Sequence, residues 1–366
     1  MNSDRNWSVL KSIKRPVLIG VIAMGWSIVL GGDLHSAGNT QAAAVEQTKP
    51  VRNSTRTALH KAIENGDIHA AMQLVSSGKD INAPDGFGLV PLHFAVIKGN
   101  DSLVLTLLKS GVDVNAQDQR GDTALHMIAA NKGSDTMAQI LLTHGAKPNI
   151  KNKTGQTPLH WIAAEGDQIL AKRILDANGD VNIKDETGDT PLHWAAEAGH
   201  QKMVALLADH GANPNLANSL GRTPIYWAAR TGNIAMAETL FGVKAKIDVR
   251  SNAGDTPLHW AAGEGHVMMV KFLIRWASDI NPQAEFKETP LHWAALQGRD
   301  EVVKLMLNHG ANMAAKDKLG NTPMALAKQK GHDTIVKLLL AHEDAIKIAM
   351  GKNPLRVASN TALVTK

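Results

Sequence analysis

The amino-acid sequence predicts an all-α repeat solenoid, and three observations support this prediction. A motif of the type Thr-Pro-Leu-His recurs nine times after residue 56. Successive copies lie 33 residues apart, except for one step of 34 residues between Thr123 and Thr157. Two short stretches with apolar residues at helical spacing follow each copy. Because one such unit cannot bury its apolar face alone, stacking of neighbouring units must create a continuous core.

The motif predicts where the first helix of each unit begins. Threonine is a good N-cap, and proline is tolerated at the first helical position, where its missing N–H costs no hydrogen bond. The leucine and the alanines that follow point inward, and the small alanines allow neighbouring helices to approach closely. The nine copies begin at Thr57, Val90, Thr123, Thr157, Thr190, Thr223, Thr256, Thr289 and Thr322.

A second helix is predicted after the glycine that follows each first helix. Met203, Val204 and Leu207 form one of its apolar sets. The second helix should end at a glycine in the left-handed conformation. Such glycines are Gly78, Gly111, Gly145, Gly211 and Gly310. Turn-rich strings, of which residues 118–122 (DQRGD) are one, then lead to the next unit.

The period and the T-P-L-H-x-A pattern resemble those of the ankyrin-repeat family. The resemblance covers about 285 residues of the chain. It implies an ankyrin-repeat stack of nine repeats, each a helix–turn–helix with a projecting β-hairpin finger. It also implies a concave groove along the first helices, and motif histidines that bond to the threonine side chain and to neighbouring backbone.

The chain is predicted to have four parts. Residues 1–44 have four basic side chains, an uncharged stretch from Val17 to Leu30 and small residues after it, as a signal peptide or signal anchor does. Residues 45–54 are a linker, residues 55–342 the repeat array, and residues 343–366 a tail that starts as a short helix. We expect export to the periplasm or beyond; the alternative is membrane anchoring by residues 17–30, a stretch shorter than the roughly 20 residues of a spanning helix.

Charge and composition exclude several functional classes. The net charge is +5, but the leader and the tail hold two surplus positive charges each, so the body carries only +1. Nucleic-acid binding needs clustered lysine and arginine, and the body has no such cluster. The chain has no cysteine, which excludes disulfides, thiolate metal sites and cysteine nucleophiles.

The histidines are regularly spaced, which favours structural roles over catalysis or metal binding. Seven of the sixteen lie in the repeat motif: His60, His93, His126, His160, His193, His259 and His292. His342 and Glu343 begin a zinc-protease pattern, but Ile346 stands where its second histidine would be. We therefore expect no enzyme, no cofactor and no metal site.

An aromatic series follows the motif histidine, or Tyr226 in its place. It comprises Trp161, Trp194, Trp227, Trp260 and Trp293, in five consecutive repeats. One interpretation is that each ring packs against its neighbours and stiffens the stack. The other, suggested by the family's groove, is a partly exposed ladder of anchors for a partner. Both interpretations stay open, and the five residues are candidate partner-binding residues.

Repeats six to eight hold most departures from the pattern, which either are neutral drift or mark a partner footprint. The further candidate partner-binding residues are Arg230, which follows the alanine pair, Phe286 at a finger tip, and Lys287 in place of the finger glycine. Tyr226 replaces the motif histidine, and Lys244 and Ala277 stand where C-cap glycines are expected.

The resemblance implies a non-enzymatic protein-binding scaffold that uses the concave groove and the hairpin fingers. Two alternatives are a membrane-anchored structural or protective envelope component that assists another enzyme, and a secreted effector directed at a host cell. We expect a protein partner, a monomer, no nucleic-acid partner, and membrane contact only through the N-terminal segment if it is not cleaved.

Overall fold

The computed structural model describes residues 56–131, 134–277 and 279–352. Within these ranges the chain forms eighteen helices that alternate as nine pairs, and no strand. The predicted leader (1–44), the linker (45–54) and the tail after residue 352 lie outside the described residues. The all-α repeat solenoid is confirmed. In the described part of the chain, no helix combines the length and the apolar character that crossing a bilayer requires.

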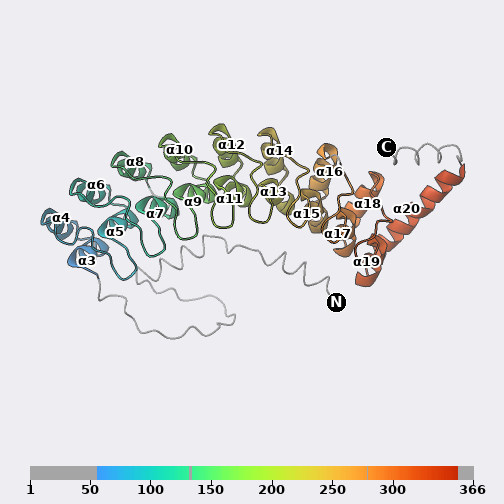
Figure 1. Ribbon diagram of the computed structural model, residues 1–366, viewed down its shortest axis with the longest axis horizontal. Coiled ribbons are helices and arrows are strands. Elements are labelled where there is room, and N and C mark those ends of the chain that lie inside the picture. The colour runs from blue at the N-terminus through green and yellow to red at the C-terminus, as the bar shows by residue number, and fades with distance from the viewer. Residues whose placement is uncertain (1–55, 132–133, 278, 353–366) are drawn as a thin grey trace, which may run out of the picture. The chain divides into compact units, whose positions relative to one another are not determined.

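The first helix of each pair follows the recurring motif and is seven or eight residues long. These helices form one row in Figure 1. They are α3 (Ala58–Glu64), α5 (Pro91–Ile97), α7 (Ala124–Ala130), α9 (Pro158–Glu165), α11 (Pro191–Ala198), α13 (Ile225–Thr231), α15 (Pro257–Glu264), α17 (Pro290–Leu296) and α19 (Pro323–Lys330).

The second helices form the outer row of the same figure. They are α4 (Ile68–Ser76), α6 (Asp101–Lys109), α8 (Asp135–Thr143), α10 (Gln168–Asp176), α12 (Gln201–Asp209), α14 (Ile234–Gly242), α16 (Val267–Trp276), α18 (Asp300–Asn308) and α20 (Asp333–Lys352). Each helix packs against its pair partner and against the equivalent helices of neighbouring pairs. One core therefore runs along the whole array.

The core consists of the residues that the motif predicts to point inward. Leu92 and Leu192 of the first helices are fully buried, as are the alanines Ala95, Ala163 and Ala195. Met203, Val204 and Leu207 of α12 are fully buried as well. A methyl side chain at the alanine positions leaves room for the next first helix, so the stacking depends on small side chains there.

The predicted C-cap glycines adopt the left-handed conformation, with φ of +68° at Gly78 and +88° at Gly145. Lys244 adopts φ +68° without being glycine, whereas Ala277 is extended at φ −89° and ψ 146°. As a result α16 keeps one residue more than the nine-residue outer helices before it, and it ends at Trp276.

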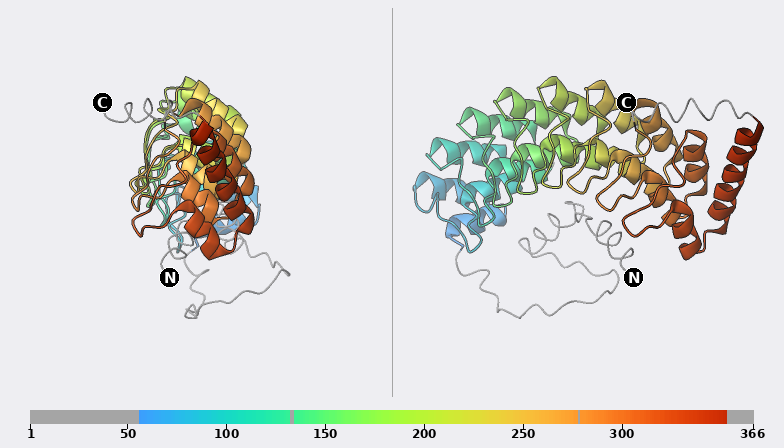
Figure 2. Two further views of the ribbon diagram at one scale, coloured as in Figure 1. Left: turned by 90° about the vertical axis from the view of Figure 1, so that its right-hand side faces the viewer. Right: turned by 45° about the vertical axis from the view of Figure 1, so that its right-hand side comes forward.

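Among the described residues the fingers are turns without β-strands, in contrast to the expected hairpins. Within one finger the Asp118 N–H donates to the Asp122 carbonyl at 3.0 Å. The Gln119 N–H donates to the Phe87 carbonyl of the preceding finger at 2.9 Å. One backbone bond per step is too few for a ladder, but it links each finger to the next. The fingers follow one another along the row of first helices in Figure 2.

An asparagine at the base of several fingers adds a second link between repeats. The Asn115 side chain donates to the Gly145 carbonyl at 3.1 Å and accepts from the Lys147 N–H at 2.8 Å. Asn149, Asn182 and Asn215 repeat both bonds one step further along. Asp248 holds the next equivalent position, where a carboxylate has no N–H to donate.

The last helix extends beyond the end of the predicted array. α20 continues without a break across residue 342, where we placed the start of the tail, and ends at Lys352. The short helix expected from Glu343 to Met350 is therefore the second half of α20. On this extension Lys347 and Glu343, which lie one turn apart, form an ion pair at 2.8 Å.

Candidate functional site

The seven motif histidines are buried structural links between repeats. At His126, Nδ1 accepts a hydrogen bond from the Thr123 N–H at 3.1 Å, so the ring proton is on Nε2. Nε2 then donates to the Gln156 carbonyl, 30 residues away, at 3.1 Å. The Thr123 hydroxyl lies 2.9 Å from the same Nδ1. Both ring nitrogens are thus used, as the family resemblance implies.

Burial lowers the pKa of these imidazoles, because it disfavours the charged form. The pKa falls to about 4 for four of them, His93, His126, His160 and His259. A neutral, fully bonded imidazole inside the stack is poorly placed to act as an acid, a base or a ligand. Among the described residues, no group of three histidine, aspartate or glutamate side chains converges in a way that would hold a metal ion.

The five tryptophans are buried, so the exposed ladder that the sequence allowed is not formed. Their side chains are between 2% and 9% exposed. The Trp161 ring stands edge-on to His126 of the preceding repeat, with ring centroids 5.4 Å apart. Trp194 meets His160 in the same way at 5.8 Å. The rings therefore fill the space between repeats, as the packing interpretation predicts.

Most of the indole N–H groups are bonded inside the repeat. Trp161 Nε1 donates to Gln156 at 2.7 Å, and Trp260 Nε1 donates to Asp255 at 2.6 Å. Both acceptors stand immediately before the motif threonine. Repeat six has Arg222 at this position, a donor in place of an acceptor. Buried Trp227 Nε1 accordingly has no acceptor among the described residues.

Repeat six differs from its neighbours in two further contacts. Tyr226 is buried, and its hydroxyl reaches the Val249 and Asp255 carbonyls at 2.9 and 2.7 Å, so it replaces the histidine link. The Arg222 guanidinium lies 4.7 Å from the centre of the Trp260 ring. This repeat is therefore held to the next by an aromatic hydroxyl and a cation–π contact.

Arg230 is half-buried on the first helix of repeat six. Its guanidinium lies 5.2 Å from the centre of the Trp227 ring, three residues earlier on the same face. Glu197, Gly263 and Leu296 hold the equivalent position in the flanking repeats. The structure thus brings two candidate residues, Arg230 and Trp227, into one contact.

Phe286 and Lys287 form a strained and exposed finger tip. Phe286 is 44% exposed, and the Lys318 ammonium of the next finger lies 5.1 Å from its ring centre. Lys287 has φ +59°, in the left-handed region that residues other than glycine rarely adopt. The preceding fingers carry glycine there, for example Gly254 at φ +73°.

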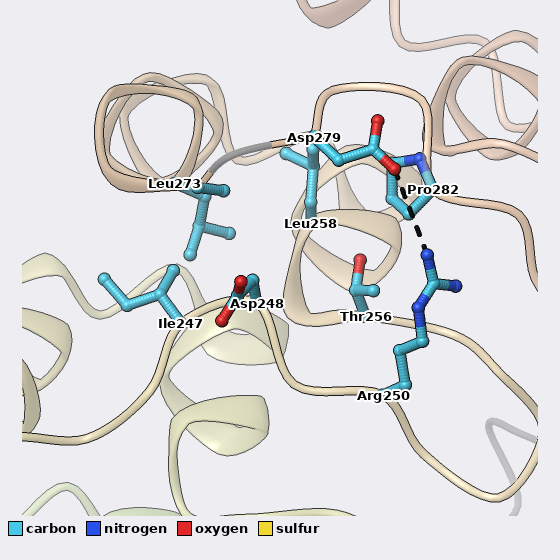
Figure 3. A pocket seen from close by; sticks show the side chains of 9 residues that line it. Ile247, Asp248, Arg250, Thr256, Leu258, Leu273, Asp279 and Pro282 are labelled. Atoms are coloured by element: carbon cyan, nitrogen blue, oxygen red, sulfur yellow. Dashed lines mark ion pairs between the residues drawn. The ribbon is translucent and has the colours of Figure 1, made fainter. Parts of the chain in front are cut away.

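A small pocket lies where the asparagine link is interrupted (Figure 3). Its volume is about 130 Å³, and it lies between residues 247–258 and residues 273–282. The Arg250 guanidinium and the Asp279 carboxylate face each other across one side at 3.9 Å. Ligand pockets usually measure roughly 300–1,000 Å³, so this cavity is a packing irregularity.

One aromatic cluster was missed by the sequence analysis. Phe241 of α14 stacks on Trp276 of α16 at 4.8 Å, and Phe272 contacts Phe241 edge-on at 6.2 Å. The cluster lies on the outer row of helices, away from the motif. A signal was present in the spacing of Met268, Phe272 and Trp276, four residues apart.

Comparison with known proteins identifies the repeats. A family model described as "Ankyrin repeats (3 copies)" matches residues 34–118, 92–185, 162–251 and 243–317. The four overlapping matches extend over well more than half of the chain. No curated protein matches the sequence.

Proposed function

Because the chain belongs to the ankyrin-repeat family, we propose that it is a non-enzymatic scaffold that binds a protein partner. Ankyrin repeats are generally protein–protein interaction modules. The nine helix pairs correspond, in this proposal, to nine repeats, and the partner contacts the first helices and fingers of repeats six to eight. The fold alone leaves the partner open, so the footprint is argued from the irregular repeats.

The observation that carries the proposal is the finger tip at Phe286 and Lys287. Lys287 in the left-handed conformation costs about 1–2 kcal/mol relative to glycine. The side chain of Phe286, just before it, is exposed to solvent. Strain of this kind is concentrated at binding and catalytic sites. The exposed Phe286 ring also offers a large apolar area that a partner could bury.

Arg230 extends the footprint to the first helices of repeat six. Arg230 is half-buried and its flat guanidinium lies over the Trp227 ring, where its hydrogen-bond donors would be available to a partner. Trp194, Trp260 and Trp293 are buried at the equivalent position of other repeats. We therefore propose Arg230, Phe286 and Lys287 as the partner-contacting residues, and we assign the tryptophans to packing.

The test is capture of a protein partner by the full chain and by single variants. Phe286→Ala and Arg230→Ala should each weaken recovery of the same partner by roughly 30-fold, as loss of a hot-spot residue does. Leu319→Ala is the matched control, because Leu319 is the exposed tip of the next finger. Unchanged recovery by both variants would remove the proposed footprint.

We also propose that the chain is exported by residues 1–44 and acts as a monomer in the periplasm or outside the cell. The basic start and the uncharged stretch from Val17 to Leu30 support export. The nearly neutral body supports a protein partner over a nucleic acid. Sequencing of the mature N-terminus would distinguish a cleaved leader from an anchor that retains residues 17–30.

A further inference from the structure

A second surface lies on the outer row of helices and takes no part in the proposed footprint. We name it the outer aromatic patch; it consists of Phe241, Met268, Phe272 and Trp276. Trp276 is 48% exposed, Phe241 38% and Met268 63%. The patch spans α14 and α16, which lie side by side in the outer row (Figure 1).

The patch exists because α16 departs from the repeat pattern. Ala277 stands where most repeats have a left-handed C-cap glycine, and it is extended. The helix therefore includes Trp276, whose ring lies against Phe241 of the preceding outer helix at 4.8 Å. The Arg275 guanidinium covers the same indole at 5.1 Å from the ring centre.

The charged residues around the patch are mainly basic. α16 carries no acidic residue, and its exposed charges are Lys271 and Arg275, which alternate with the apolar side chains. On α14 and the connection up to residue 246, the charged residues are Lys244, Lys246 and Glu238. Aromatic rings interleaved with cations suit a partner that is both apolar and anionic.

We propose that the outer aromatic patch, with Lys271 and Arg275, binds the surface of an anionic membrane. Four side chains expose far less area than the roughly 800 Å² that each partner buries in a stable protein interface. The headgroup region, by contrast, accepts single tryptophan and phenylalanine rings. The exposed cations Lys271 and Arg275 on the same helix would be attracted to anionic headgroups.

This proposal is independent of the protein partner and goes beyond the expectation that only the N-terminal segment meets a membrane. Weak interfacial binding becomes stable when two signals act together. The apolar rings of the patch would be one signal, and the cations Lys271 and Arg275 would be the other. The patch would then fix which side of the array faces the lipid.

The test uses the absence of cysteine in the chain, which permits one site-specific label. Met268→Cys in the full chain carries an environment-sensitive bimane fluorophore. Ile169→Cys is the matched control, because Ile169 is 69% exposed on the outer helix α10 but has no aromatic neighbour in the patch. Each labelled chain is mixed with vesicles of phosphatidylcholine alone or of equimolar phosphatidylcholine and phosphatidylglycerol.

The label at 268 should lose its quenching by aqueous iodide on the anionic vesicles, and the label at 169 should not. Adding Lys271→Gln and Arg275→Gln should restore quenching, since each cation near an anionic surface contributes roughly a factor of five to binding. Trp276→Ala should act in the same direction. Circular dichroism confirms that each variant is folded.

Three results would overturn the proposal. The first is that the protein sediments with anionic vesicles, but iodide quenches the label at 268 equally with and without them. The second is equal protection on phosphatidylcholine alone, because the proposal requires anionic lipid. The third is protection at 268 by a protein partner but not by vesicles, which would assign the patch to a protein. Loss of partner capture in Phe286→Ala is unaffected by any of the three.

Discussion

Acidification should destabilise the array chiefly through its motif histidines. Burial lowers the pKa of His93, His126, His160 and His259 to about 4, whereas the pKa of an unfolded histidine is about 6.5. As the pH falls below 6.5, the unfolded chain takes up protons that the folded chain refuses until the pH is near 4. The stability that is fully present above pH 6.5 is therefore lost between pH 6.5 and 4.

The magnitude follows from these pKa values. Between pH 7 and pH 5 each of the four histidines should cost about 2 kcal/mol of unfolding free energy, so the four together cost about 7 kcal/mol. Asp122 acts in the opposite direction, because burial raises its pKa to about 6. Its protonation in the folded state returns about 1 kcal/mol, which leaves a net loss of about 6 kcal/mol.

The assay is chemical denaturation followed by circular dichroism at pH 7 and pH 5. His126→Gln should be less stable than the parent at pH 7, because it weakens the link from Thr123 to Gln156. Its loss between the two pH values should be about 2 kcal/mol smaller, since one titrating group is gone. His69→Gln, at an exposed position, is the control for removing a histidine elsewhere.

The prediction is wrong if His126→Gln and the parent lose the same free energy of unfolding between pH 7 and pH 5. That result would show that the pKa of the His126 imidazole is the same in the folded and the unfolded chain. The prediction is also wrong if the parent has the same free energy of unfolding at pH 7 and pH 5.

Other substitutions test the packing. Gly155→Ala should destabilise the array more than Gly211→Ala, and their denaturation midpoints should differ. Both glycines have positive φ, but only at Gly155 would a Cβ meet the backbone of the next finger, 2.7 Å from the Glu186 nitrogen. Tyr226→Phe leaves two carbonyls without their shared donor and should cost about 1–3 kcal/mol by the same assay. Trp260→Ala should cost about 3–5 kcal/mol, whereas half-exposed Trp276→Ala should cost under about 1 kcal/mol in thermal denaturation.

The repeat fold could be predicted because its signals are local. The threonine that caps a first helix, the proline after it and the glycine that ends the second helix act through the backbone of their own few residues. The Thr123–His126 contact lies within one turn, and it forms as the resemblance implies. The described residues contain none of the strands expected in the fingers, because a strand needs several consecutive backbone bonds and each finger makes only one backbone bond to its neighbour.

The candidate site was only partly predictable. Sequence spacing located Arg230, Phe286 and Lys287 in the irregular repeats, but it could not show that Lys287 is strained or that Arg230 lies on Trp227. The outer cluster of Phe241 and Trp276 was missed, since its two halves belong to different repeats and meet only after stacking.

The sequence by itself determined the all-α repeat solenoid and the ends of most helices, because capping and chain reversal depend on residues close together in the chain. Only the tertiary structure decided which of the aromatic side chains meet solvent. Trp161 and Trp276 show the reason. Both are large aromatic residues on short helices, yet Trp161 is buried against His126 of the preceding repeat, whereas Trp276, the last residue of α16, is exposed. Exposure depends on the neighbouring repeat, which spacing within one repeat does not contain.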